Sequence, residues 1–309
     1  MNDTPEIIGS EHAGVGAAVV IPAFNAAATI VETLRALQAC PGVEELGGVF
    51  VCDDASTDNT TQLAAAAWTS IPKLTILQNG ERLGQHGTVN AAFARLRKCY
   101  EWIFILHADD VVKENWLDLY FQRIKVTEPR VASICSSYDC WYPATSKVDP
   151  GQDDLDRDLE IVQGTRESVL GTLKAGCWWH ISGCAIRLER FFDIGGFRPH
   201  LDYMADFDWL LRCLKLGYDI EYIPRTTMLY RMHLASISSN SLRRGQDLIE
   251  WLEILGSYCD EGYLTKRQLR AVRAQSAYTA LKRTGKLLFA GQLQYSGNML
   301  SVCWRALRG

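Results

Sequence analysis

Up to residue 140, the sequence alternates between short apolar runs and longer segments with helical spacing. Each run is rich in β-branched residues and is followed by a polar turn and then by apolar residues that recur every three or four positions. This alternation predicts an α/β fold with a mostly parallel sheet covered by helices on both faces. The predicted strands are 17–21, 48–52, 74–77, 102–106 and 131–136, and the predicted helices are 26–38, 58–68, 87–97 and 114–126.

The second half of the sequence is less regular. Pro143, Pro150 and a cluster of four acidic residues between 153 and 158 predict an exposed excursion over 137–176. Beyond residue 241 the pattern is one helix after another, so we expect an α/β domain, 1–240, and a helical C-terminal extension, 241–309. The other predicted elements are a strand at 181–188, a helix at 206–216, short strands at 220–223 and 227–231, and helices at 242–258 and 265–288.

The charged residues are unevenly distributed. The 309-residue chain has 32 basic and 36 acidic residues, a formal net charge of −4, which argues against a protein that coats nucleic acid. Residues 266–309 include nine basic residues and no acidic one, so the rest carries 23 basic against 36 acidic residues, a net charge of −13. Apolar residues lie among the basic ones, which fits either a helix at an anionic membrane surface or a helix packed on the core with a solvated basic face.

Cysteine usage and the N-terminal residues indicate the cellular compartment of the protein. The ten cysteines form no CxxC pair and mostly lie in apolar runs, as reduced thiols of a cytosolic protein do. The first twelve residues lack the features of a signal peptide, and the apolar stretch 15–24 is too short to span a bilayer. We therefore expect a soluble cytoplasmic protein, located at the inner face of the membrane if the basic helices bind lipid.

Acidic residues follow two of the predicted strands, at the edge of the sheet where ligands bind in such folds. Asp53 and Asp54 could accept hydrogen bonds from a base or from ribose hydroxyls, or could favour the start of the next helix. Asp109 and Asp110 offer hard oxygen ligands for a Mg²⁺ or Mn²⁺ ion that holds a diphosphate, or could cap the following helix.

Two later motifs add charged candidates. Asp206 and Asp208 open a predicted helix, and a carboxylate there could be the general base for a hydroxyl nucleophile. Arg231 could pair with a diphosphate, and His233 could contact a metal or phosphate, although a lone histidine is more often an ordinary residue.

Two adjacent tryptophans are further candidates. Trp178 and Trp179 could pack against sugar faces in an acceptor cleft, or could be one core and one rim residue. The residues that we assign to the acceptor side are Trp178, Trp179, Asp208 and Arg231.

Taken together, the order and spacing of these motifs resemble the family 2 glycosyltransferases, which have the GT-A fold. The resemblance covers residues 15–240. It rests on the stretch 19–25, the DDxSxDxT stretch 53–60, the residues 79–90, the acids Asp109 and Asp110, the stretches 183–187 and 195–197, Asp206, and Arg231-x-His233.

The resemblance implies where a nucleotide binds. Pro22, Ala23 and Asn25 would flank the nucleotide pocket, Asp54 would contact the base, and Asp109 would hold the ribose.

The resemblance also implies a metal and a catalytic base. Asp109, Asp110 and His233 would approach a Mn²⁺ or Mg²⁺ ion and the diphosphate, and Asp206 would deprotonate the acceptor. The family often has an acid two residues before the Asp109 position, where this sequence has His107, so the motif departs from DxD and ligation would rest on Asp109 or Asp110.

The expected function is therefore an inverting transfer of one sugar from a nucleotide-diphosphate sugar, with a UDP-sugar the leading candidate, to a glycan or lipid-linked acceptor in cell-surface polysaccharide biosynthesis. The QxxRW motif and the membrane bundle of processive synthases are absent, which favours single additions. The alternative is a non-catalytic relative that binds a nucleotide or glycan. A dinucleotide-binding oxidoreductase is disfavoured because no GxGxxG follows the first strand. Nucleic acid is not an expected partner.

Overall fold

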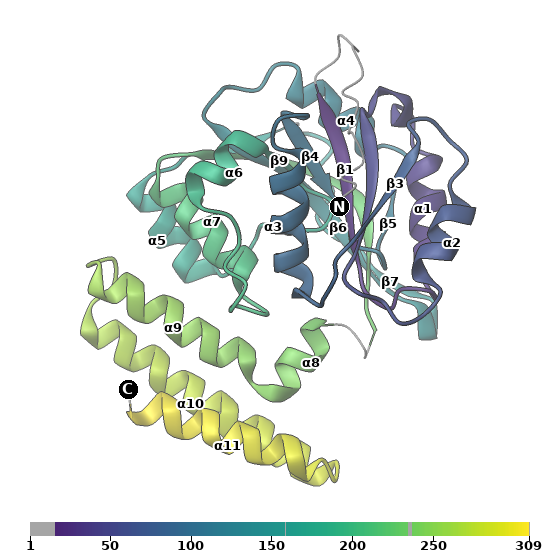
Figure 1. Ribbon diagram of the computed structural model, residues 1–309. Coiled ribbons are helices and arrows are strands. Elements are labelled where there is room, and N and C mark those ends of the chain that lie inside the picture. The colour runs from purple at the N-terminus through teal and green to yellow at the C-terminus, as the bar shows by residue number, and fades with distance from the viewer. Residues whose placement is uncertain (1–15, 158, 234–236, 309) are drawn as a thin grey trace.

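The computed structural model describes residues 16–157, 159–233 and 237–308 (Figure 1). The first twelve residues, which lack the features of a signal peptide, lie outside these ranges.

Ten strands of the described chain form one curled, mostly parallel sheet in the order β3-β2-β1-β4-β9-β6-β10-β5, with β7 paired to β6 and β8 to β10. The long strands share one direction, whereas β9 runs antiparallel between β4 and β6, and β5, β7 and β8 also pair antiparallel. The strands are β1 (Ala17–Ala23), β2 (Gly48–Asp53), β3 (Leu74–Gln78), β4 (Trp102–Ile105), β5 (Val111–Val112), β6 (Val131–Tyr142), β7 (Lys147–Asp149), β8 (Glu160–Val162), β9 (Ala185–Arg187) and β10 (Asp219–Arg231).

Helices cover both faces of this sheet, as the sequence predicts (Figure 1). The alternation along β1 shows how: Ala18 and Val20 contact the helices of one face, and Val19 and Ile21 those of the other. The first face is covered by α3 (Gly84–Leu96), α5 (Arg166–Ala175), α6 (Leu188–Ile194), α7 (Ala205–Lys215) and part of α9 (Gln246–Asp260), and the second by α1 (Ile30–Gln38), α2 (Thr60–Ala67) and α4 (Trp116–Ile124).

Three predicted elements differ from the structure. The excursion 137–176 is largely ordered, because β6 continues to Tyr142 and the segment also contains β7, β8 and α5. The two short strands predicted around Pro224 are one strand, β10, whose pairing with β6 shifts register there. The helix predicted at 242–258 is divided at Gly245, whose positive φ of 74° ends α8 (Ile237–Arg244) and whose missing Cβ leaves room for Val302.

The C-terminal helices pack partly on the α/β core. Ile254, Leu255 and Tyr258 of α9 belong to the same buried cluster as α7, and so does Leu269 of α10 (Lys266–Phe289). A second, smaller cluster joins α10, α11 (Leu293–Arg308) and Leu248 of α9. Figure 1 shows the α10–α11 hairpin on the side of α9 that faces away from the sheet. No helix within the described ranges is both long and apolar enough to cross a bilayer. We retain the boundary near residue 240 as a proposal.

Candidate functional site

The carboxyl ends of β1, β2 and β4 meet at one edge of the sheet, and their loops are tied together. The Asn25 backbone N–H donates to the Ser56 hydroxyl, and the Asn25 side-chain oxygen accepts from Thr57 N at 2.8 Å. Asn25 has a φ of 48°, a left-handed conformation that asparagine tolerates better than most residues. Pro22 and Ala23 are buried in β1 beneath this loop, so only Asn25 of the three predicted nucleotide neighbours is exposed.

Asp54 is buried and its carboxylate holds the loop that leads into α3. Its two oxygens accept from Asn79 Nδ2 at 3.1 Å, Leu83 N at 2.7 Å and Gly84 N at 2.9 Å. The sequence suggests contact with a base, and that contact stays a prediction. In the structure, the Asp54 carboxylate also fixes the loop beside the predicted pocket.

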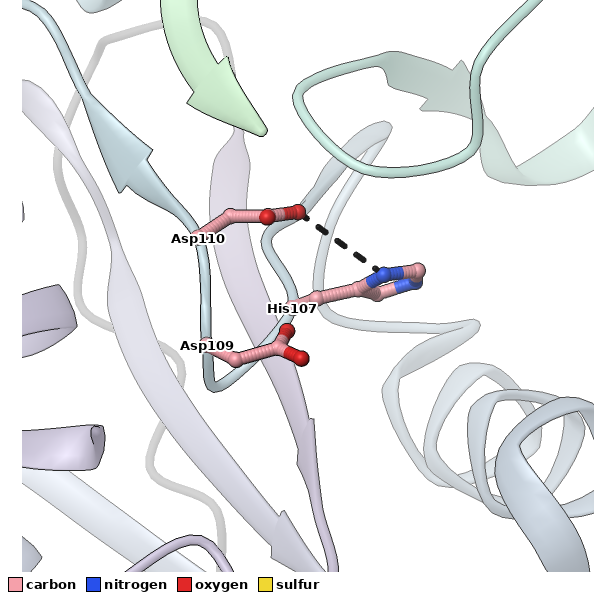
Figure 2. A group of neighbouring side chains, drawn as sticks. All are labelled: His107, Asp109 and Asp110. Atoms are coloured by element: carbon pink, nitrogen blue, oxygen red, sulfur yellow. Dashed lines mark ion pairs between the residues drawn. The ribbon is translucent and has the colours of Figure 1, made fainter. Parts of the chain in front are cut away.

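The residues after β4 bring three potential metal ligands together. One ligand atom each from His107, Asp109 and Asp110 lies within 4.8 Å of the other two (Figure 2). Asp110 is fully buried, with Oδ2 3.9 Å from His107 Nδ1, and this oxygen has no hydrogen-bond partner among the described residues. Because a buried carboxylate oxygen without a partner is costly, the arrangement favours a bound cation. His107, the departure from the family pattern, thus belongs to the group.

The end of β10 reaches this group because β5, which follows Asp110 directly, pairs with it. The Arg231 backbone N–H donates to Asp110 Oδ1 at 3.0 Å, and its guanidinium donates to the Asp109 carbonyl and ion-pairs with Glu32. His233 Nε2 donates to Asp109 Oδ2 at 2.9 Å. Arg231 therefore lies on the metal side, not on the acceptor side where the sequence-based assignment put it. Ligation of a metal by His233 stays a prediction.

The two acids of this group differ in protonation. Burial raises the pKa of Asp110, and the nearby charge of Asp109 raises it further. Burial also pushes the pKa of Asp109 upward, but the hydrogen bond from His233 and the charge of His107 outweigh it, so the net pKa is lowered. Burial lowers the pKa of His107 to about 4, which keeps the ring neutral and able to act as a ligand.

Asp206 lies in the first turn of α7, half-buried, and its Oδ1 accepts from Phe207 N at 2.7 Å. Burial raises the pKa of its carboxyl to about 7. A base with such a pKa is suited to accept a proton at neutral pH.

Aromatic side chains fill the region between Asp206 and the His107 group. Tyr138 interacts electrostatically with Asp206 and packs on the His180 ring, with centroids 4.6 Å apart. The His180 ring lies 6.4 Å from that of His107. His180 Nδ1 donates to the Ser182 carbonyl, and the Ser182 hydroxyl accepts the His107 backbone N–H. Tyr138, His180, Ser182, Glu32 and Gln85, whose amide contacts His107 Nε2, were missed because no local spacing marks residues that meet only in the folded chain.

Two acceptor-side predictions are wrong. Trp179 is 1% exposed, packs on Trp209 and donates to the Ser133 hydroxyl, so it is a core residue. Asp208 is buried, and its carboxylate is paired with Arg198 and Arg212.

Trp178, the neighbour of the buried tryptophan, is half-buried and donates to the Thr172 hydroxyl. It keeps some exposed surface, so its place in an acceptor cleft stays a prediction.

Comparison with known families agrees with this geometry. The model of the glycosyl transferase family 2 matches residues 18–152, which includes β1 to β4, Asp54 and the His107 group. The matched segment is similar to the family 2 glycosyltransferases. A curated relative, the succinoglycan biosynthesis protein ExoA of Rhizobium meliloti (strain 1021), is 24% identical over 217 residues; the match covers 69% of this chain and 62% of the relative's length.

Solved structures confirm the GT-A fold of the α/β domain. Residues 1–349 of S. aureus TarS in complex with UDP-GlcNAc align with a TM-score of 0.65 at 16% identity, covering 94% of this chain and 81% of that one. The mannosyltransferase PcManGT from Pyrobaculum calidifontis in complex with GDP-Man and Mn²⁺ aligns with a TM-score of 0.56 at 18% identity, covering 94% and 87%. At such identities the likeness concerns the fold.

Proposed function

We propose that this chain is an inverting glycosyltransferase that moves one sugar from a nucleotide-diphosphate sugar to a hydroxyl group of a glycan or lipid-linked acceptor. One observation carries the proposal: three potential metal ligands gather after β4, and the rings of His180 and Tyr138 link this group to Asp206, whose pKa is raised to about 7. The metal ligands suit a departing diphosphate, and Asp206 suits removal of a hydroxyl proton.

The donor side of the proposal rests on a divalent cation. His107 Nδ1, Asp109 and Asp110 would hold it, and the unpartnered Oδ2 of Asp110 is the structural reason to expect one there. An imidazole ligand favours Mn²⁺, because Mg²⁺ prefers oxygen ligands and water. When bound, the cation would supply positive charge that stabilises the departing diphosphate.

The reaction that we propose is a single displacement. Asp206 takes the proton of the acceptor hydroxyl while its oxygen attacks the anomeric carbon, and the bond from that carbon to the diphosphate breaks, releasing a nucleoside diphosphate. Attack from the face opposite the leaving group inverts the anomeric configuration. Arg231 is positioned by Glu32 and the Asp109 carbonyl near the leaving diphosphate, which its guanidinium could bind.

The substrate classes follow from the relatives. TarS has been solved with UDP-GlcNAc and PcManGT with GDP-Man, which supports a nucleotide-sugar donor, and we propose a UDP-sugar. ExoA is named for succinoglycan biosynthesis, which supports a role in assembling a cell-surface polysaccharide, at the cytoplasmic side where nucleotide sugars are available.

The test is a calorimetric screen of UDP, GDP and their sugars with and without Mn²⁺, followed by assays of donor hydrolysis and transfer. We expect binding that requires the metal and slow hydrolysis of the bound donor. The variant Asp118→Asn, on the exposed side of α4, is the matched control for Asp109→Asn. Binding without any hydrolysis or transfer would instead favour a non-catalytic relative, and absence of nucleotide binding would contradict both.

We further propose that the α10–α11 hairpin contacts an anionic membrane. Both helices carry an exposed apolar stripe with a spacing of three and four residues, and their opposite sides pack on α9 and on each other. The stripes consist of Tyr278, Leu281 and Leu288 on α10 and Leu293, Leu300, Trp304 and Leu307 on α11. We call them the apolar stripes.

The charge around the apolar stripes identifies the partner. Lys282, Lys286 and Arg305 are exposed beside them, and the chain has no acidic residue after residue 265. A second copy of this surface would bring like charges together, whereas anionic lipid headgroups complement it. Such contact would place the enzyme where a lipid-linked acceptor lies.

Vesicle co-sedimentation tests the membrane proposal with the full chain. We expect the wild-type protein to bind vesicles that contain anionic lipid. In the double variant Leu281→Ser and Leu300→Ser the vesicle affinity should fall at least about tenfold, because two apolar side chains no longer enter the membrane. The matched control is Leu155→Ser combined with Leu216→Ser, two exposed apolar side chains outside the hairpin. Equal binding by the apolar-stripe variant, or a dimer in sedimentation velocity that this variant abolishes, would overturn the proposal.

A further inference from the structure

Glu250, in the middle of α9, is a buried acid that the proposed reaction does not yet use. Its side chain is 1% exposed, although it lies on a helix beyond the predicted domain boundary. Its Oε1 accepts from Asp202 N at 2.9 Å, and its Oε2 accepts from Tyr203 N at 2.9 Å and Met204 N at 2.7 Å. Gln246, one turn earlier on α9, donates to the same carboxylate at 2.9 Å.

The three backbone N–H groups belong to the turn that enters α7. The α7 helix begins at Ala205 with Met204 as its N-cap, and no side chain of its own segment caps it. Glu250 therefore supplies, from another helix, acceptors for the backbone of this turn and a negative charge close to the start of α7. Trp251, the next residue on α9, packs on Phe207 of α7 with ring centroids 5.3 Å apart, which adds an apolar contact to the polar one.

Asp206 lies two residues after this turn, so its placement depends on how the turn is held. A displacement of about 1 Å in a catalytic group can cost on the order of 10²-fold in rate. A turn whose three consecutive N–H groups converge on one carboxylate has little freedom to shift, because each hydrogen bond would have to lengthen together with the others.

Glu250 also acts on Asp206 through its charge. Burial is the main reason that the pKa of Asp206 is raised, and the negative charge of Glu250 raises it further. Burial raises the pKa of every other titratable group that interacts with Asp206, which leaves these groups neutral at pH 7: Tyr138 on β6, Cys177 and Cys184 in the segment after α5, and Tyr203. Among the described residues, the charged group shown to act on Asp206 is thus Glu250.

We infer that Glu250 is a positioning residue for the catalytic base: it fixes the 202–204 turn and thereby sets both the place of Asp206 and the electrostatic field around it. This inference rests on the proposed role of Asp206. It makes a helix beyond residue 240 part of the support for the catalytic base, since Glu250 lies on α9, past the boundary proposed near residue 240.

The test compares Glu250→Gln with Glu250→Asp and with Glu253→Gln. Glu253 lies on the same helix, is exposed and pairs with His200, so it is the matched control. In Glu250→Gln an amide N–H₂ replaces one accepting oxygen and the charge is lost. We expect kcat to fall roughly ten- to a hundredfold with an unchanged donor KM, and the acid limb of the pH profile to move to lower pH.

The aspartate variant separates the effect of the negative charge from the effect of side-chain length. Glu250→Asp keeps the negative charge but is one methylene too short, so we expect a lower kcat with the acid limb close to its wild-type position. Glu253→Gln should resemble wild type in both respects. A Glu250→Gln enzyme with normal kcat and an unchanged acid limb of the pH profile would overturn the inference. A lower kcat with an unchanged acid limb would also overturn it, because a purely structural effect would then explain the loss.

Two measurements do not need the transferase activity. Amide hydrogen exchange should rise at residues 202–206 in Glu250→Gln, with the β1–β4 region unchanged, and a carboxyl carbon titration of Asp206 by NMR should report the lower pKa directly. If the wild-type protein transfers no sugar but these two changes are observed, the proposed function fails while the positioning role of Glu250 stands. If neither change is observed, the positioning role fails whatever the activity.

Discussion

Asp110 and Asp206 both have carboxyl groups whose pKa is raised by burial, yet they are held by different parts of the molecule. Asp110 follows β4 directly and is fixed by the neighbouring end of β10, so the sheet itself places it. Asp206 begins a helix on one face of the sheet, and the turn before it is held by Glu250 of α9. We call these the donor side and the acceptor side.

The difference shows what a sheet can and cannot position. Parallel strands align their carboxyl ends, so short loops after β2 and β4 bring Asp54 and Asp110 to the same edge without further support. A helix N-terminus is not aligned by pairing with neighbouring strands, and its first backbone N–H groups need acceptors from elsewhere. The donor side is therefore contained in the α/β fold, whereas the acceptor side depends on the helices that follow it.

The largest effect is expected from Asp206→Asn. Loss of a general base should lower kcat by about 10²- to 10⁴-fold and leave Mn²⁺ and UDP binding unchanged, because the donor side is held separately. Steady-state kinetics combined with calorimetry provide the two readouts. Asp118→Asn, on the exposed side of α4, serves as control, and normal turnover of Asp206→Asn would remove this residue from the mechanism.

Trp179→Ala should mainly affect stability. Removing this buried ring is expected to cost about 3–5 kcal/mol of unfolding free energy, measured by urea denaturation. Trp178→Ala should cost much less, since that side chain is half-buried and chiefly loses its hydrogen bond to Thr172. If Trp179→Ala changed acceptor KM without loss of stability, the acceptor side would extend to a residue that the structure places in the core.

His233→Ala tests the donor side alone. His233 donates to Asp109, and loss of such a supporting contact is expected to weaken Mn²⁺ affinity by about 10- to 100-fold. At saturating Mn²⁺ the kcat should return close to the wild-type value, because Asp206 is unaffected. The measurement is Mn²⁺ binding followed by electron paramagnetic resonance, with the exposed His200→Ala as control. A lower kcat that excess metal does not restore would show that the two sides are coupled.

The smallest effect is the pH dependence. Because Asp206 must be deprotonated to act as base and its pKa is raised to about 7, kcat at saturating Mn²⁺ should rise by about tenfold per pH unit below pH 7 and level off above it. An acid limb near pH 4 would mean that the carboxyl is more solvated in the working enzyme than in this structure.

Much of the donor side could be predicted from the sequence, because period-two strands and the acids that follow them are local signals. Asp54, Asp109 and Asp110 all lie at the predicted edge, directly after β2 and β4. The acceptor side was predicted less well. Asp208 and Trp179 look like surface residues in the sequence, but each is buried by partners that lie far along the chain or on the next turn of its helix. Glu250 has no sequence signal at all, since its importance arises from a contact across 46 to 48 residues.

The short pairing of β5 with β10 has a consequence for how the protein is made. The residues that hold Asp110 and Asp109 in place, Arg231 and His233, are more than 120 residues further along the chain. On the ribosome, β1 to β4 can emerge and begin to pair while the metal-binding group still lacks these contacts. A nascent or truncated chain that ends before residue 231 should therefore fail to retain Mn²⁺, so an incomplete enzyme would not sequester the ion from the cell.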